Sequence, residues 1–197
     1  MMNQEIEIEF KNMLSKSKYD ELLTAFDINR DSIIRQENHY FDTPDFQLKA
    51  LASGLRIRIL PNKIECTLKE QANENTHIET TDLLTVDEAT QMTNGLIFPA
   101  SNVKARLIEL GIDVESLSLF GSLVTDRVEI AYKGGLLVLD HSYYLQCDDY
   151  EVEYETQDEI VGKNIFRQFL VKYNIPVAHA QKKIARFAAA LAASQSE

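Results

Sequence analysis

Apolar and polar side chains alternate along much of this chain, which is the pattern of β-strands with one buried face. In the segment 55–59, three aliphatic residues alternate with Arg56 and Arg58. Successive side chains of a strand point to opposite faces, so this segment would bury one face and present two guanidinium groups on the other. The same reasoning predicts strands at 3–11, 32–42, 54–60, 64–70, 76–83, 117–132, 136–143 and 149–157.

A second spacing of apolar residues predicts helices. Tyr19, Leu22 and Phe26 recur at helical spacing in the segment 16–26. Ser101 and Gly111 are suitable start and stop signals around a helix. We therefore expect helices at 16–26, 44–51, 86–92, 102–110, 159–173 and 180–193.

Turn residues suggest how the strands are joined. Pro61-Asn62 and Lys133-Gly134-Gly135 each separate two predicted strands, as expected for hairpins. Eight strands joined largely by hairpins predict an α+β fold, in which an eight-stranded antiparallel sheet could close into a β-barrel with helices packed outside. The 197 residues contain no evident linker, repeat or low-complexity segment, so we expect a single domain over residues 1–197.

The overall charge narrows the possible partners. The formal net charge is -11 and the sequence pI is about 4.9, which argues against bulk binding of nucleic acid or of an anionic membrane. No basic and apolar leader and no long apolar span is evident, so we expect a soluble cytoplasmic protein. Cys66 and Cys147 lack metal-ligand spacing and are expected to be buried free thiols.

Two rows of like charge stand out within the predicted strands. Glu7, Glu9 and Lys11 share one face of the first strand, and Glu151, Glu153 and Glu155 share one face of the last. A row of carboxylates repels itself, so it persists most easily where cations neutralise it. Hard oxygen ligands of this kind favour Mg²⁺ or Mn²⁺.

An alternative explanation is that these charges simply face water, because a half-exposed antiparallel sheet also alternates apolar and charged residues. The distribution of charge favours a site instead. Acids gather on the first and last strands, whereas Arg56, Arg58, Lys69 and Arg127 lie on strands between them. We therefore expect the acids on one wall of an enclosed channel and the cations on the others, as suits a polyanion with its metals.

Eight short segments together resemble the CYTH domains, which are also called triphosphate tunnel metalloenzymes. They occur in the family's order along nearly the whole chain. They are Glu7-Ile8-Glu9-Phe10-Lys11, Tyr40-Phe41-Asp42-Thr43-Pro44, Leu55-Arg56-Ile57-Arg58, Thr67-Leu68-Lys69, Arg127, Asp140, Glu151-Val152-Glu153 and Lys183-Ile184-Ala185-Arg186-Phe187.

The resemblance implies a barrel whose lumen is a tunnel for a triphosphate and divalent cations. The implied metal ligands, also read as catalytic together with Lys11, are Glu7, Glu9, Asp140, Glu151 and Glu153. Asp140 is either a ligand or a group that orients water. The implied phosphate-binding residues are Lys11, Arg56, Arg58, Lys69, Arg127, Lys183 and Arg186. A lysine also precedes Lys183, which leaves open whether Lys182 or Lys183 enters the tunnel.

The resemblance further implies a Mg²⁺- or Mn²⁺-dependent hydrolase that releases orthophosphate from a triphosphate. The chain has no tryptophan, which is commonly the aromatic platform for thiamine triphosphate, and this disfavours that substrate. Inorganic tripolyphosphate is the leading substrate. The alternatives are an adenylate cyclase, a thiamine triphosphatase and a non-catalytic polyphosphate-binding or nucleotide-binding module. The expected partner is a small triphosphate compound, without nucleic acid or membrane, and a homodimer is possible.

Overall fold

The computed structural model describes residues 4–194, and its eight strands pair in the order of a closed barrel, as the sequence predicted. Their order around the barrel is β1-β5-β4-β3-β2-β6-β7-β8. The strands are β1 (Gln4–Leu14), β2 (Ile34–Asp42), β3 (Ser53–Ile59), β4 (Ile64–Gln71), β5 (Thr76–Leu84), β6 (Ser118–Tyr132), β7 (Gly135–Tyr144) and β8 (Cys147–Thr156).

Six α-helices accompany the strands in the described part of the chain. They are α1 (Lys16–Ala25), α2 (Gln47–Ala50), α3 (Val86–Thr93), α4 (Ser101–Glu109), α5 (Glu159–Lys172) and α6 (Lys183–Ser194). The chain divides into two compact units, each with its own core. Unit 1 contains residues 4–6 and 36–123, and unit 2 contains residues 7–35 and 124–194. The single domain expected from the sequence stays a prediction.

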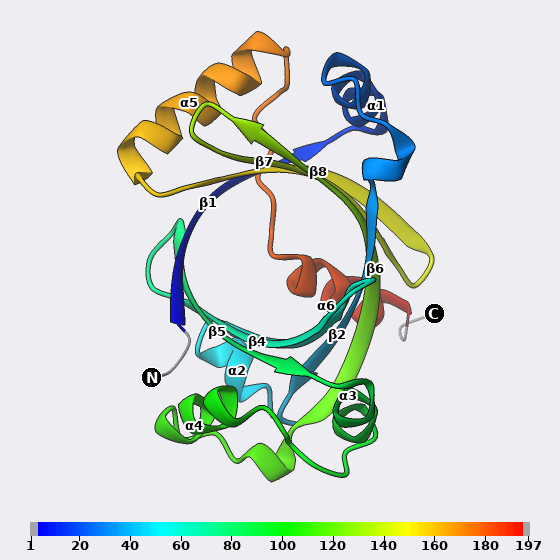
Figure 1. Ribbon diagram of the computed structural model, residues 1–197, viewed down its shortest axis with the longest axis vertical. Helices are drawn as coiled ribbons and strands as arrows, with labels where there is room; N and C mark the ends of the chain where they lie inside the picture. Colours follow the sequence, from blue (N-terminus) through cyan, green and yellow to red (C-terminus); the bar gives the residue numbers. More distant parts are fainter. Residues whose placement is uncertain (1–3, 195–197) are drawn as a thin grey trace. The chain divides into compact units, whose positions relative to one another are not determined.

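In unit 1, the alternating pattern of β3 and β4 builds the core. Leu55 and Ile57 lie directly opposite Leu68 and Cys66 in the antiparallel register, and all four side chains are fully buried. Helices α3 and α4 cover this apolar face (Figure 1). Because period two fixes the opposite orientation for the intervening residues, Arg56, Thr67 and Lys69 fall on the other face.

Unit 2 has three layers. The apolar faces of its strands, including Phe10, Leu139 and Val152, pack against α1 and α5 in one hydrophobic core. Figure 1 shows α1 and α5 beside β7 and β8. Helix α6 lies against the opposite, polar face of the same strands, which its side chains contact through ion pairs. The sheet of unit 2 therefore separates an apolar layer from a charged one.

Each predicted strand and helix has a counterpart in the described residues, but several of their ends differ. The predicted start of the first strand, Asn3, lies outside the described residues, and β1 continues to Leu14 because it pairs with β8 as far as Tyr150. Helix α2 is a single turn rather than the whole of 44–51. Helix α6 begins at Lys183 rather than at residue 180. Short 3₁₀ turns at Arg30–Ser32 and Val114–Ser116 were not predicted.

The expectation for the cysteines was half right. Both thiols are free, and Cys66 is buried, with a pKa raised by that burial. Cys147 is exposed, because it begins β8 beside the turn from β7 instead of packing in a core. Among residues 4–194, no helix is both long and apolar enough to cross a membrane.

Candidate active site

The polar face of unit 2 collects charged residues from four strands. In the antiparallel register, Lys11 of β1 lies opposite Glu153 of β8, and Asp140 of β7 lies opposite both Glu151 of β8 and Arg127 of β6. Directly opposite residues share a face of the sheet. The pairing therefore brings together residues that are far apart in the sequence.

Three carboxylates form the centre of this face. Asp140, Glu151 and Glu153 are 0%, 1% and 4% exposed, and each offers an oxygen within 4.8 Å of the others. Three buried acids so close together need cations, since unpaired charge is costly away from water. We call these three residues the carboxylate cluster.

Arg127 provides the first of those cations. Its Nε donates to Asp140 Oδ1 at 2.8 Å, and its Nη2 donates to Asp140 Oδ2 at 2.6 Å and to Glu153 Oε2 at 3.0 Å. The two-pronged geometry uses the planar fork of a guanidinium group. Burial opposes ionisation of Asp140, but the charges of Arg127 and Lys183 outweigh it, and the pKa of Asp140 is lowered.

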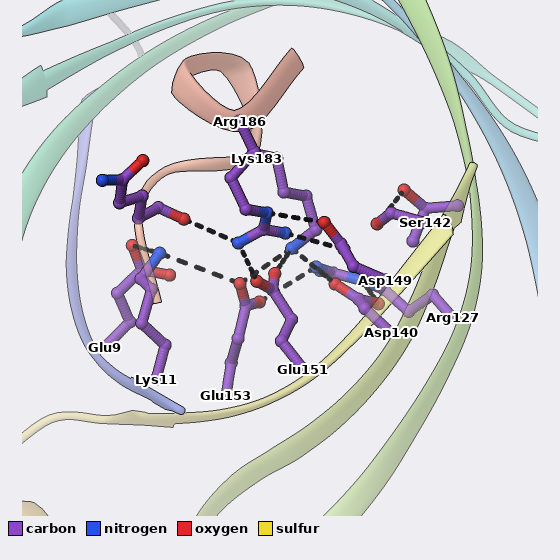
Figure 2. A network of polar contacts seen from close by, with 12 residues as sticks. Glu9, Lys11, Arg127, Asp140, Ser142, Asp149, Glu151, Glu153, Lys183 and Arg186 are labelled. Carbon is purple, nitrogen blue, oxygen red and sulfur yellow. Dashed lines mark hydrogen bonds and ion pairs between the residues drawn. The ribbon is translucent and has the colours of Figure 1, made fainter. Parts of the chain in front are cut away.

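Helix α6 supplies two more cations. Lys183 Nζ lies 2.8 Å from Asp140 Oδ2 and 2.9 Å from Glu153 Oε1, and it also contacts Glu151. Arg186 Nη1 lies 2.7 Å from Glu151 Oε2, and its Nε lies 2.8 Å from Asp149 Oδ2. Figure 2 shows both side chains reaching from α6 toward these carboxylates. Burial lowers the pKa of Lys183 to about 7, although Asp140 acts in the opposite direction.

Strand β1 places a further ion pair at the edge of the cluster. Lys11 Nζ lies 2.9 Å from Glu9 Oε1 and 3.8 Å from Glu153 Oε1. Burial disfavours the ammonium form, but Glu153, Glu9 and Glu7 outweigh it and raise the pKa of Lys11. Glu7 is on the same face as Glu9 by alternation and is half-buried.

The remaining predicted cations lie in unit 1. Arg56 and Arg58 of β3 share the polar face with Lys69 of β4, whose Nζ lies 3.4 Å from Glu79 Oε1 of β5. Burial alone would raise the pKa of Glu79, but the charges of Arg56, Lys69 and Arg58 lower it. This face of unit 1 therefore gathers positive charge around the half-buried carboxylate of Glu79.

The Glu79→Gln variant is expected to lower the free energy of unfolding by about 1–3 kcal/mol at pH 7, because it removes the carboxylate whose charge interacts with Arg56, Lys69 and Arg58 on this half-buried face. The folded pKa of Glu79 is lowered, so its stabilisation is present above the unfolded value near 4.5 and is lost as the pH falls through the folded value. Urea denaturation at pH 7 and pH 3 should show the difference narrowing in acid. Exposed Glu74→Gln is the control; equal stability of wild type and Glu79→Gln at pH 7 would contradict the prediction.

Sequence reasoning left three acids of these polar faces out of the site. Asp149 binds Arg186, Glu79 lies beside Lys69, and Glu155 is half-buried two residues after Glu153. Burial raises the pKa of Glu155 to about 7; Arg127 opposes the shift, whereas Glu7 and Glu153 add to it. For the acids of the last strand the sequence did contain a signal, because alternate positions 149, 151, 153 and 155 are all acidic and share one face of the strand.

The cations and acids of unit 2 are interleaved, contrary to the separate walls that the sequence suggested. Lys11, Arg127, Lys183 and Arg186 all pair directly with carboxylates, because buried acids bind the nearest cations. His141, although adjacent to Asp140, bonds to Asp148 at 2.8 Å and to Tyr143 at 2.7 Å on the other face.

Comparison with known proteins identifies the family. The family model of the CYTH domain matches residues 5–188 of this chain. This chain belongs to the CYTH domain family. A CYTH relative from Bacillus subtilis (strain 168), named "Putative triphosphatase YjbK", is 41% identical over 186 residues, which are 94% of this chain and 96% of the relative. The resemblance noted in the sequence is thus confirmed.

Solved structures share the CYTH fold. One from Bacillus halodurans, described as "a putative adenylate cyclase", is 38% identical, with a TM-score of 0.90, and the match covers 94% of this chain and 99% of that one. A Hippeastrum protein, HpAC1, described as a "putative adenylyl cyclase" with a dominant triphosphatase activity, is 23% identical, with a TM-score of 0.78, and the match covers 94% of this chain and 95% of that one. At that identity the Hippeastrum structure supports the fold alone.

Proposed function

We propose that this protein is a metal-dependent hydrolase of triphosphates, with inorganic tripolyphosphate as its preferred substrate. The observation that carries the proposal is the carboxylate cluster, whose oxygens lie within 4.8 Å of one another beside Arg127 and Lys11. Membership of the CYTH family and 41% identity to a relative named as a triphosphatase support the same reaction.

The donor set fits a divalent cation. Asp140, Glu151 and Glu153 offer hard oxygen atoms, which Mg²⁺ and Mn²⁺ prefer. Glu7 and Glu9 would add further carboxylates from β1. A bound cation would neutralise part of the phosphate charge and would lower the pKa of a water molecule bound to it. Because Arg127 engages both oxygens of Asp140, we assign Asp140 chiefly to positioning and Glu151 and Glu153 to direct binding.

The protein's cations would bind the phosphoryl groups. Arginine grips a phosphoryl group through its planar fork, whereas lysine acts as a compact charge. The proposed phosphate-binding residues are Lys11, Arg56, Arg58, Lys69, Arg127, Lys183 and Arg186. Phosphoryl transfer needs little covalent chemistry from the protein, so positioning and charge neutralisation supply most of the acceleration. Water attacks the terminal phosphorus, the bridging P–O bond breaks, and orthophosphate and diphosphate leave.

The choice of substrate depends on which side chains could bind the organic part of a triphosphate compound. The sequence has no tryptophan to stack on a thiamine ring. An adenylate cyclase would in addition need a base pocket and activation of the ribose hydroxyl. Tripolyphosphate needs only the charged groups described above. A cytoplasmic location, a small-molecule partner and a possible homodimer belong to the same proposal.

The test is product analysis with purified protein, tripolyphosphate, ATP and thiamine triphosphate, with Mg²⁺ or Mn²⁺. Orthophosphate should be released fastest from tripolyphosphate, and EDTA should reduce its release to background. Cyclic AMP with pyrophosphate from ATP would instead identify a cyclase. Tight binding of tripolyphosphate without any product would identify a binding module.

A further inference from the structure

The ammonium group of Lys183 lies among the oxygens proposed to bind metal. Its Nζ is 2.8 Å from Asp140 Oδ2 and 2.9 Å from Glu153 Oε1, and it contacts Glu151 as well. These are the same three residues whose oxygens could hold an ion. Figure 2 shows the side chain extending from α6 into the middle of the carboxylate cluster. One lysine therefore contacts all three residues of the carboxylate cluster.

We propose that Lys183 is the resident cation of the metal site: it neutralises the carboxylate cluster until a divalent cation displaces it, and only then turns to the substrate's phosphate. The inference rests on the proposed role of these carboxylates as metal ligands and not on the identity of the substrate. It gives Lys183 two consecutive partners, first carboxylates and then phosphate.

Charge balance explains why a cation has to leave. Asp140, Glu151 and Glu153 contact the cationic side chains of Arg127, Lys183 and Arg186, and Lys11 lies 3.8 Å from Glu153. These cations offset the negative charge of the cluster, so it attracts a divalent ion weakly while all of them stay. Loss of one ammonium group restores negative charge where the metal binds.

Lys183 is the cation best suited to leave. Arg127 is bound by two prongs to Asp140 on the neighbouring strand. Arg186 is also held outside the cluster, by Asp149 at 2.8 Å and by the carbonyl oxygen of Gln181 at 2.7 Å. Lys183 carries a single ammonium group on a flexible four-carbon stem, and its ion pairs in the described part of the chain are to the three members of the cluster.

The backbone before α6 can remain in place while Lys183 moves. Met13 N donates to the carbonyl oxygen of Ala178 at 3.0 Å, and Ala178 N donates to Asn12 Oδ1 at 2.8 Å. On the helix itself, Phe187 is 3% exposed. These contacts fix the chain on both sides of Lys183. Exchange of partner therefore needs only rotation of a side chain.

The test is Mn²⁺ binding by isothermal titration calorimetry without substrate, comparing wild type with Lys183→Met. Removal of the competing ammonium group should tighten Mn²⁺ binding about tenfold or more, whereas KM for tripolyphosphate should rise because a phosphate contact is lost. The matched control is Lys182→Met, the adjacent lysine, which should leave Mn²⁺ affinity unchanged. A lysine with a purely structural role would not tighten metal binding when removed.

A second measurement on the wild-type protein covers the case in which Lys183→Met fails to fold. Reductive methylation followed by mass spectrometry should find Lys183 protected in EDTA and labelled in saturating Mg²⁺, with Lys182 as the internal reference. Unchanged labelling of Lys183, or equal Mn²⁺ affinity of wild type and Lys183→Met, would overturn the inference and leave the proposed function standing. Failure of Mn²⁺ to bind either protein would refute the proposed metal site itself.

Discussion

The Glu153→Gln variant is expected to lower kcat/KM for tripolyphosphate by about 10²–10³-fold. Glu153 is 4% exposed, lies 2.9 Å from Lys183, 3.0 Å from Arg127 and 3.8 Å from Lys11, and belongs to the carboxylate cluster. An amide keeps the shape of the side chain but removes the charge that would hold a divalent cation. The loss should therefore appear as weaker metal binding and slower turnover in a fold that is intact.

The measurement is steady-state release of orthophosphate across a titration of Mg²⁺, with circular dichroism as a check of folding. Glu115→Gln is the matched control because that side chain is 81% exposed, and its activity should equal that of wild type. Full activity of Glu153→Gln at limiting Mg²⁺ would show that Glu153 does not bind the metal.

The Arg127→Met variant is expected to lose about 3–5 kcal/mol of unfolding free energy without metal, the cost of breaking a buried ion pair by removing one partner. Arg127 makes both prongs of the contact to Asp140, which is fully buried, and a third bond to Glu153. Methionine fills similar space but leaves these carboxylates with less compensating charge. Mg²⁺ should restore part of the loss, because it binds only the folded state.

Urea denaturation in EDTA and in Mg²⁺ measures both effects. Arg167→Met on the exposed side of α5 is the control, with an expected change within about 0.5 kcal/mol. A similarly small change for Arg127→Met would mean that the carboxylates find other partners or become protonated at no cost.

The strands and their faces could be predicted from sequence because period two is a local property. Arg56 and Leu55 fall on opposite faces wherever the strand lies, and the same holds for Glu153 and Val152. Prediction failed where a distant partner decides the outcome. Helix α6 was expected to begin at residue 180, but it begins at Lys183, after a stretch whose backbone is tied at Ala178 to Asn12 and Met13 of β1. Such long-range bonds outweigh helix propensity.

The predicted length of helix α2 was also wrong, here because of contacts within a few residues. Asp42 accepts hydrogen bonds from the backbone of Thr43, Leu48 and Lys49, which folds the chain back on itself. Phe46 sits at φ 58°, in the left-handed region, directly before the helix. Only one helical turn follows, because the turn geometry rather than the apolar spacing sets where the helix can begin.

The sequence by itself determined which charges share a face, and hence that carboxylates and cations of β1, β6, β7 and β8 could meet. Only the tertiary structure decided how they pair: Lys183 and Arg186 arrive from α6 onto Asp140, Glu151 and Asp149. Strand alternation follows from backbone geometry within a few residues. The pairing of ions depends on the distances between charged groups. Those distances are set by the folding of the whole chain and cannot be predicted from a local sequence pattern.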